Sequence, residues 1–180
     1  LGLAARSESG PIASAAALIR HATTPAAVTA SVAFVPNPGA SAALLTVPWL
    51  IVCATTAVLG IGRLASRPKI APTVAIDVGL LYLAVGAAWL TISRAGANPP
   101  NFGDELVQLT AVHFHFAGVA LPLLSGVAAQ RSGRGSTVPL LAAIGVPLTA
   151  VGIAVGGTLE WGAATFMAVG GLLTAWMVQR

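Results

Sequence analysis

The chain of 180 residues is 56% hydrophobic and only 8% charged, with a formal net charge of +4 at neutral pH. Soluble globular domains carry about 25% charged residues, so this composition excludes an ordinary soluble protein. The positive residues form no stripe with interleaved aromatic side chains, which argues against nucleic acid as a partner, and the single cysteine excludes disulfides and multi-cysteine metal sites within the chain.

The apolar residues come in continuous blocks of about 20 residues, the length that an α-helix needs to cross about 30 Å of hydrocarbon. They do not alternate with polar residues as they would in the strands of a membrane β-barrel. The sequence therefore predicts an all-α, polytopic transmembrane bundle of about six spans in one domain, separated by segments rich in proline, glycine and asparagine. The predicted spans are 13–35, 44–64, 72–93, 105–129, 137–155 and 159–178.

The first predicted span is interrupted by Arg20, His21 and Pro25. An interfacial helix followed by a short hydrophobic piece is therefore the alternative for this segment. No signal peptide is visible, because residues 1–10 are largely polar. The chain opens on Leu1 and not on methionine, which leaves room for a further span upstream.

The loops between the predicted spans orient the bundle. Under a six-span arrangement Arg94 alone falls on one side, whereas the other side holds Arg6, Arg63, Arg67, Lys69, Arg131, Arg134 and Arg180. Positive residues concentrate in cytoplasmic loops, so we expect both ends of this chain to be cytoplasmic.

The fourth predicted span contains two histidines, His113 and His115. Ionisable groups at membrane depth are costly and usually face a cavity or a partner, so this pair marks a candidate site. At 100° per residue the two side chains point about 200° apart, and in a regular helix they cannot easily ligate one metal ion. We therefore expect no metal site here, and we expect only one of the two imidazoles to face a given cavity.

Further polar and aromatic residues are predicted in the outer half of the bundle, where they could line a pocket with the histidines. They are Trp49, Trp89, Arg94, Glu105, Gln108, Phe114, Phe116, Glu160 and Trp161. Each type also has a structural explanation: acids favour helix N-termini, arginines snorkel at span ends, and tryptophans form interfacial belts. Asp77 lies about two turns from the cytoplasmic end of its span, where it either pairs with a neighbouring helix or serves as a second functional acid.

Several short segments resemble the bacterial YndJ-like membrane proteins. They are Gly-Ala-Ala-Trp-Leu at 86–90, Arg-Ala-Gly at 94–96, Thr-Ala-Val-His-Phe-His-Phe-Ala-Gly at 110–118, Pro-Trp-Leu at 48–50 and Leu-Glu-Trp at 159–161. The likeness runs from about residue 44 to 165. It implies a multi-helix protein of the bacterial plasma membrane, but it does not imply a chemistry. A looser analogy, at the level of the fold, connects the chain with small membrane-bound isoprenoid cyclases.

These features favour an enzyme without a cofactor that acts on a lipophilic substrate inside the bilayer. A carboxyl group in an apolar pocket keeps its proton, so Glu160, or else Asp77, could protonate an alkene or open an epoxide. His113 or His115 could orient the acid or reclaim a proton, and aromatic faces could stabilise a carbocation. Cyclisation or isomerisation of an isoprenoid is the reaction expected from this set of groups.

Two alternatives remain open. In a small proton-coupled transporter, Asp77, the histidines and Glu160 would form a relay, although the chain shows no internal repeat. In a haem- or metal-binding membrane subunit, His113-Phe114-His115 would act like the haem-ligating helix that it resembles in haem–copper oxidases, although that family needs more than the three histidines present here. The expected partners are a lipophilic small molecule, membrane lipids and a second copy of the chain.

Overall fold

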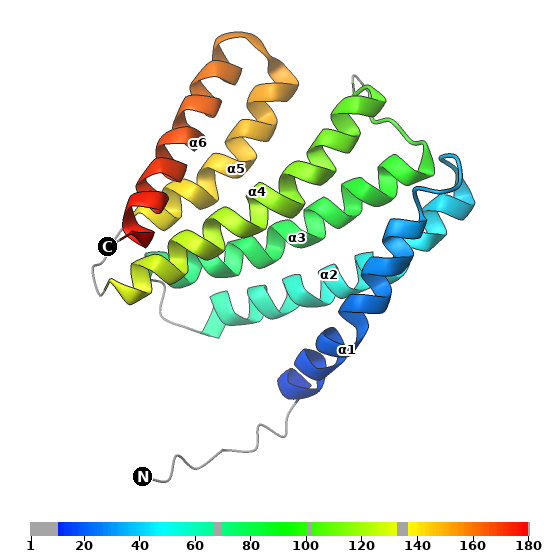
Figure 1. The fold of residues 1–180 in the computed structure, drawn as a ribbon, viewed down its shortest axis with the longest axis horizontal. Coiled ribbons are helices and arrows are strands. Elements are labelled where there is room, and N and C mark those ends of the chain that lie inside the picture. Colours follow the sequence, from blue (N-terminus) through cyan, green and yellow to red (C-terminus); the bar gives the residue numbers. More distant parts are fainter. Residues whose placement is uncertain (1–10, 67–69, 101, 133–136, 180) are drawn as a thin grey trace.

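The computed structural model describes residues 11–66, 70–100, 102–132 and 137–179. All regular secondary structure in these residues is helical, so the predicted all-α fold is confirmed. The helices are α1 (Pro11–Val32), α2 (Ala40–Ser66), α3 (Ala71–Ala95), α4 (Asp104–Arg131), α5 (Val138–Val155) and α6 (Gly157–Val178) (Figure 1).

Helices α2 to α6 are long and apolar enough to cross a membrane, as a polytopic bundle requires. Within the described residues α1 is not among these candidate spans, because Arg20, His21 and Pro25 dilute its apolar character. The described residues thus contain five candidate spans, one fewer than the six predicted. Of the positive residues that oriented the bundle, five lie outside the described residues: Arg6, Arg67, Lys69, Arg134 and Arg180.

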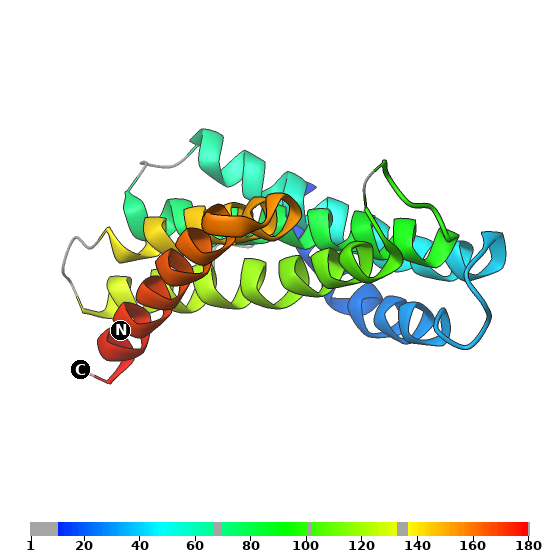
Figure 2. The same cartoon turned by 90° about the horizontal axis from the view of Figure 1, so that it is seen from above.

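Successive helices lie side by side and run in alternating directions (Figures 1 and 2). The α3–α4 pair has the most extensive contact, with α2 against α3, α5 against both α3 and α4, and α6 against α5 and α4. Among the described helices, α1 packs on α2 alone. The α1–α2 and α3–α4 loops meet at one end of the bundle, which is called the outer end below, following the predicted orientation.

Glycines allow α3 and α4 to approach closely. A Cβ atom on Gly126 would lie 2.6 Å from Cγ1 of Ile76 and 2.7 Å from the carbonyl oxygen of Pro72. A Cβ atom on Gly118 would lie 3.0 Å from Cβ of Tyr82. Lipid provides no hydrophobic drive for helix association, so such close packing is a main source of stability in a membrane bundle.

The outer end of α1 is attached to α3 through Arg94. The Arg94 Nε donates to the carbonyl of Ala33 at 3.0 Å, and Nη2 donates to the carbonyl of Pro36 at 2.8 Å. The guanidinium also lies 4.9 Å from the centre of the Phe34 ring. Carbonyls at the end of a helix lack partners within the helix, so Arg94 supplies donors that the end of α1 needs.

The packing at Gly126 leads to a stability prediction. Replacing Gly126 with alanine should lower the melting temperature in detergent, because the added methyl group meets backbone and side-chain atoms of α3. Overpacking of this kind costs about 1–3 kcal/mol. The matched control is Gly62→Ala in α2, where nothing lies within 4 Å, and it should be neutral or slightly stabilising. Equal melting temperatures for the two variants would contradict the close contact of α3 and α4.

Candidate functional site

The imidazole of His115 lies between α4 and α2 with both ring nitrogens bonded. Its Nδ1 is 2.8 Å from the carbonyl oxygen of Ala111, one turn earlier in α4. Its Nε2 is 2.8 Å from Nε1 of Trp49 in α2. A carbonyl only accepts and an indole nitrogen only donates, so Nδ1 carries the proton and Nε2 keeps its lone pair. The two partners therefore select one neutral tautomer of His115.

Gly86 of α3 makes room for this imidazole. A Cβ atom at Gly86 would lie 2.7 Å from Nδ1 of His115 and 3.0 Å from the His115 backbone nitrogen. On the other side, the indole of Trp49 lies nearly parallel to the imidazole, at 20° with 6.0 Å between ring centres. Three helices thus fix the orientation of His115, which makes it a pre-organised group and not a freely rotating one.

His115 lies in the wall of a shallow, open groove of about 240 Å³. Helices α1 to α4 and the residue Phe34 just after α1 contribute to its lining, which is Ala27, Ala30, Ser31, Phe34, Trp49, Leu90, Ala111, Val112, His115 and Phe116. The lining contains no charged side chain. A second groove of about 440 Å³ lies between α1 and α2, is lined by apolar residues and threonines, and likewise contains no acid. His115 is therefore the titratable group that a molecule in the smaller groove would meet.

His113 points to the opposite side of α4. Its Nε2 donates to the carbonyl of Val146 in α5 at 2.9 Å. Close by, the Tyr82 hydroxyl donates to the carbonyl of Ala143 at 2.7 Å. Pro147 has no N–H to bond that carbonyl within α5, so Tyr82 of α3 satisfies a group that the proline leaves free. His113 and Tyr82 therefore bond α5 to the α3–α4 pair.

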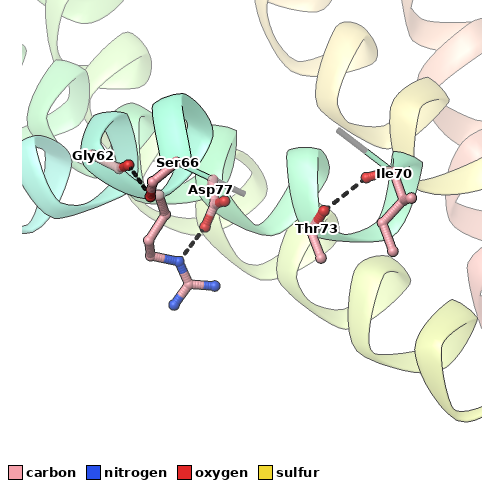
Figure 3. Close-up of polar contacts among 6 residues, drawn as sticks. Gly62, Ser66, Ile70, Thr73 and Asp77 are labelled. Carbon is pink, nitrogen blue, oxygen red and sulfur yellow. Dashed lines mark hydrogen bonds and ion pairs between the residues drawn. The ribbon is translucent and has the colours of Figure 1, made fainter. Parts of the chain in front are cut away.

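Asp77 forms an ion pair with Arg63 of α2, at 2.6 Å between Oδ1 and Nε (Figure 3). Only 1% of Asp77 is exposed, whereas the Arg63 side chain is about one-third exposed. The pair lies near the end of the bundle opposite the outer end, close to the Thr73–Ile70 bond at the start of α3. Asp77 was predicted either to pair with a neighbouring helix or to serve as a second functional acid. In the structure it pairs with Arg63 of α2.

The remaining predicted site residues are dispersed. The Trp89 indole stacks on Phe102 with 5.3 Å between ring centres, and the Phe114 ring is buried with its edge against Tyr82. Arg94 bonds the end of α1. The exposed members of the predicted pocket are Glu105, Gln108, Phe116, Glu160 and Trp161. The structure thus brings together Trp49, His115 and Phe116, but it does not bring Glu105 or Glu160 into their groove.

Sequence reasoning did not single out Gly86, Ala111 or Phe34, although each of them contacts the groove or shapes it. The small residues at 86–88 were a signal for close helix contact, but nothing in their spacing identified His115 as the group in contact. Within the described ranges, no cluster of three or more histidine, cysteine or acidic side chains could hold a metal ion.

The Arg63–Asp77 pair leads to a second stability prediction. Arg63→Gln leaves the buried carboxylate without its cation. Loss of one partner of a fully buried pair costs about 3–5 kcal/mol, and the partial exposure of Arg63 places the expected cost below that range. Asp77→Asn should cost less, because Arg63 can extend towards water. The double variant should recover part of the loss in melting temperature. If Arg63→Gln lowered the melting temperature no more than the exposed control Arg131→Gln, the Arg63–Asp77 ion pair would not stabilise the fold.

No solved structure matches the chain. The "Uncharacterized membrane protein YndJ" of Bacillus subtilis (strain 168) is 39% identical over 49 residues, which cover 27% of this chain and 9% of that relative. The chain is therefore similar to a small part of that much longer protein. The model of the YndJ-like protein family matches residues 1–180, and the chain is a membrane protein that belongs to this family.

Proposed function

We propose that the protein is an intramembrane enzyme that isomerises a lipophilic molecule by moving a proton, with His115 as the acid–base group. The observation that carries the proposal is the position of His115, whose Nδ1 bonds Ala111 and whose Nε2 accepts from Trp49 at an open groove without charged side chains. In the reaction Nε2 exchanges the bond from Trp49 for the substrate, removes a proton from a carbon next to a carbonyl group, where that proton is acidic enough for an imidazole, and returns a proton to another carbon. The step needs no other reactant, because the proton that leaves is balanced by the proton that arrives.

The geometry favours isomerisation over cyclisation. A cyclisation started by a carboxylic acid needs that acid in the wall of the substrate cavity, and the groove lining contains none. Glu160 is exposed in the first turn of α6, and Asp77 is bonded to Arg63. A single histidine placed as a general base contributes typically about 10²–10⁴ in rate.

A proton-coupled carrier is the second candidate, and the Asp77–Arg63 pair favours it. Buried ionisable groups within membrane spans often belong to proton or ion pathways. Protonation of Asp77 would release Arg63, whose side chain already reaches the protein surface. The exchange experiment below separates the two candidates, because a carrier does not exchange carbon-bound protons of its cargo.

The test of the enzyme uses solvent deuterium, so that the substrate need not be known in advance. The full chain in lipid nanodiscs is incubated in D₂O with a bacterial lipid extract, and deuterium bound to carbon is measured by mass spectrometry. We expect one lipophilic compound to gain deuterium with the native protein and with Glu160→Gln. His115→Phe should abolish the gain, whereas His113→Phe, the matched control on the opposite face of α4, should retain it.

Deuterium gain that is unaffected by His115→Phe would overturn the role of His115. A complete lack of exchange, together with accumulation of a solute in vesicles that depends on Asp77, would favour the carrier. The melting temperature of His115→Phe in detergent, compared with those of the native protein and His113→Phe, shows whether its loss of exchange reflects a general loss of folding.

The proposed setting is the bacterial plasma membrane with both ends of the chain in the cytoplasm. Alkaline phosphatase, which is active only outside the cytoplasm, should be active when it is fused in the 96–103 loop and inactive at the C-terminal end. A fusion before α1 should be inactive if α1 crosses the membrane. Phosphatase activity at the C-terminal end would reverse the orientation, because the charge bias of the loops would then have been misread.

A further inference from the structure

We propose that the groove between the ends of α4 and α6 binds a phospholipid with a net negative charge, with its phosphate on Arg131 and its acyl chains along the apolar wall. The groove lies at the end of the bundle opposite the outer end, where the last turns of both helices meet (Figure 1). It is separate from the groove that contains His115, so this inference does not depend on the proposed function.

The groove has a cation at one end and a hydrocarbon wall along its length. Its volume of about 590 Å³ lies within the range of about 300–1,000 Å³ that is typical of sites for small molecules. The α4 residues of the lining share one helix face, which extends about 10 Å along the axis from Leu124 to Arg131. The complete lining is Leu124, Val127, Ala128, Arg131, Ser132, Met177 and Val178.

The Arg131 side chain has no counter-charge in the part of the chain that the structure describes. It is exposed, and its guanidinium makes no ion pair or hydrogen bond with another described residue. Asp77, the described acid nearer this end of the bundle, is paired with Arg63. The acids in the first turns of α4 and α6 lie at the far ends of those helices, and they are Asp104, Glu105 and Glu160. Arg131 is therefore available to a negative group from outside these residues.

The end of α4 does not use the guanidinium either. Arginines near the end of a helix often donate to its last carbonyls. In α4 the backbone N–H of Ser132 donates to Ala128 at 3.0 Å, and the Ser132 hydroxyl donates to Ala129 at 2.9 Å. The planar set of N–H donors on Arg131 matches two oxygens of a phosphate group, and it remains open to such an acceptor.

The groove lies at the level where lipid headgroups are expected. Both α4 and α6 are candidate spans, and Arg131 and Trp176 belong to their last turns. Trp176 is half exposed, and tryptophans gather at the membrane–water interface. A phosphate at this level meets Arg131, while the acyl chains pass Val127 and Leu124 towards the centre of the bilayer. Basic pockets between spans bind anionic headgroups in this way.

The charge and the lining together select the class of ligand. A zwitterionic lipid brings its own cation close to Arg131, and no unpaired acid among the described residues lies at this end to receive that cation. A free phosphate ion would bind Arg131 but would leave the apolar side chains of Leu124 and Val127 exposed. Burial of that apolar surface therefore favours a lipid over the free ion.

The test measures lipid binding to the full chain in a mild detergent by native mass spectrometry, with phosphatidylglycerol and phosphatidylcholine of identical acyl chains as probes. One molecule of phosphatidylglycerol should bind about fivefold more tightly than phosphatidylcholine, the factor expected from one arginine near a membrane surface. Arg131→Gln should remove this preference, and Arg131→Lys should retain most of it. The matched control Arg20→Gln changes an exposed arginine of α1 outside this groove and should leave the preference intact.

The apolar wall is tested with two exposed leucines of α4. Leu124→Ala shortens a lining residue and should weaken the binding of both lipids several-fold. Leu123→Ala, outside the lining, should have little effect on either lipid. Inorganic phosphate at millimolar concentration should not displace phosphatidylglycerol, because it makes no apolar contact.

Melting temperatures show that the variants remain folded. Without added lipid, Arg131→Gln should melt like the native protein, and phosphatidylglycerol should raise the melting temperature of the native protein but not that of the variant. A preference for phosphatidylglycerol that survives Arg131→Gln, or that falls equally in Arg20→Gln, would refute the site, because the attraction would then arise from the general charge of the chain. Displacement by inorganic phosphate would refute the lipid and make the groove a site for a free anion.

Discussion

At Gly86, no side chain separates α3 from the imidazole of His115, and the rest of the candidate site depends on this contact. With α3 so close, His115 has one face against a backbone and its Nδ1 directed to its own helix. Its other nitrogen is left to meet α2, where Trp49 lies. In lipid, where packing and hydrogen bonds provide the association energy, the contact that joins α3 to α4 also aligns the imidazole of His115, the proposed acid–base group.

Most polar side chains of the bundle serve its backbone. Thr55, Thr56 and Thr110 each bond a carbonyl one turn earlier, while Tyr82 bonds a carbonyl that a proline leaves free. No buried side-chain nitrogen or oxygen of the described residues lacks a partner. The Trp49–His115 bond joins two side chains of α2 and α4, as the Thr46–Thr91 bond joins α2 and α3. It differs in lying at an open groove, which is why the proposed site is centred on His115.

The sequence allowed the helices to be predicted, because apolar runs and the loops between them are local features. The rotation of each helix about its axis depends on contacts with other helices, so it could not be predicted from local sequence. Glu160 was expected to face the histidines, but Gly152 of α5 lies against Ala163 and the backbone of Glu160, and in this packing of α6 on α5 the Glu160 side chain is exposed. Arg94 was expected in the pocket, yet its acceptors lie about 60 residues earlier in the chain, where no periodicity could reveal them. The opposite directions of His113 and His115 were predictable, since they depend only on helical geometry.

The attachment of α1 has a consequence for the order in which the protein is made. The donor that holds the end of α1 belongs to Arg94, a residue synthesised 61 positions after its acceptor Ala33. At about 5–20 residues per second, α1 therefore waits several seconds on the ribosome before its anchor exists. During that interval α1 can pack on α2, which is the helix that it contacts in the fold. The bonds that fix the segment after α1 form only once Arg94 of α3 has been made.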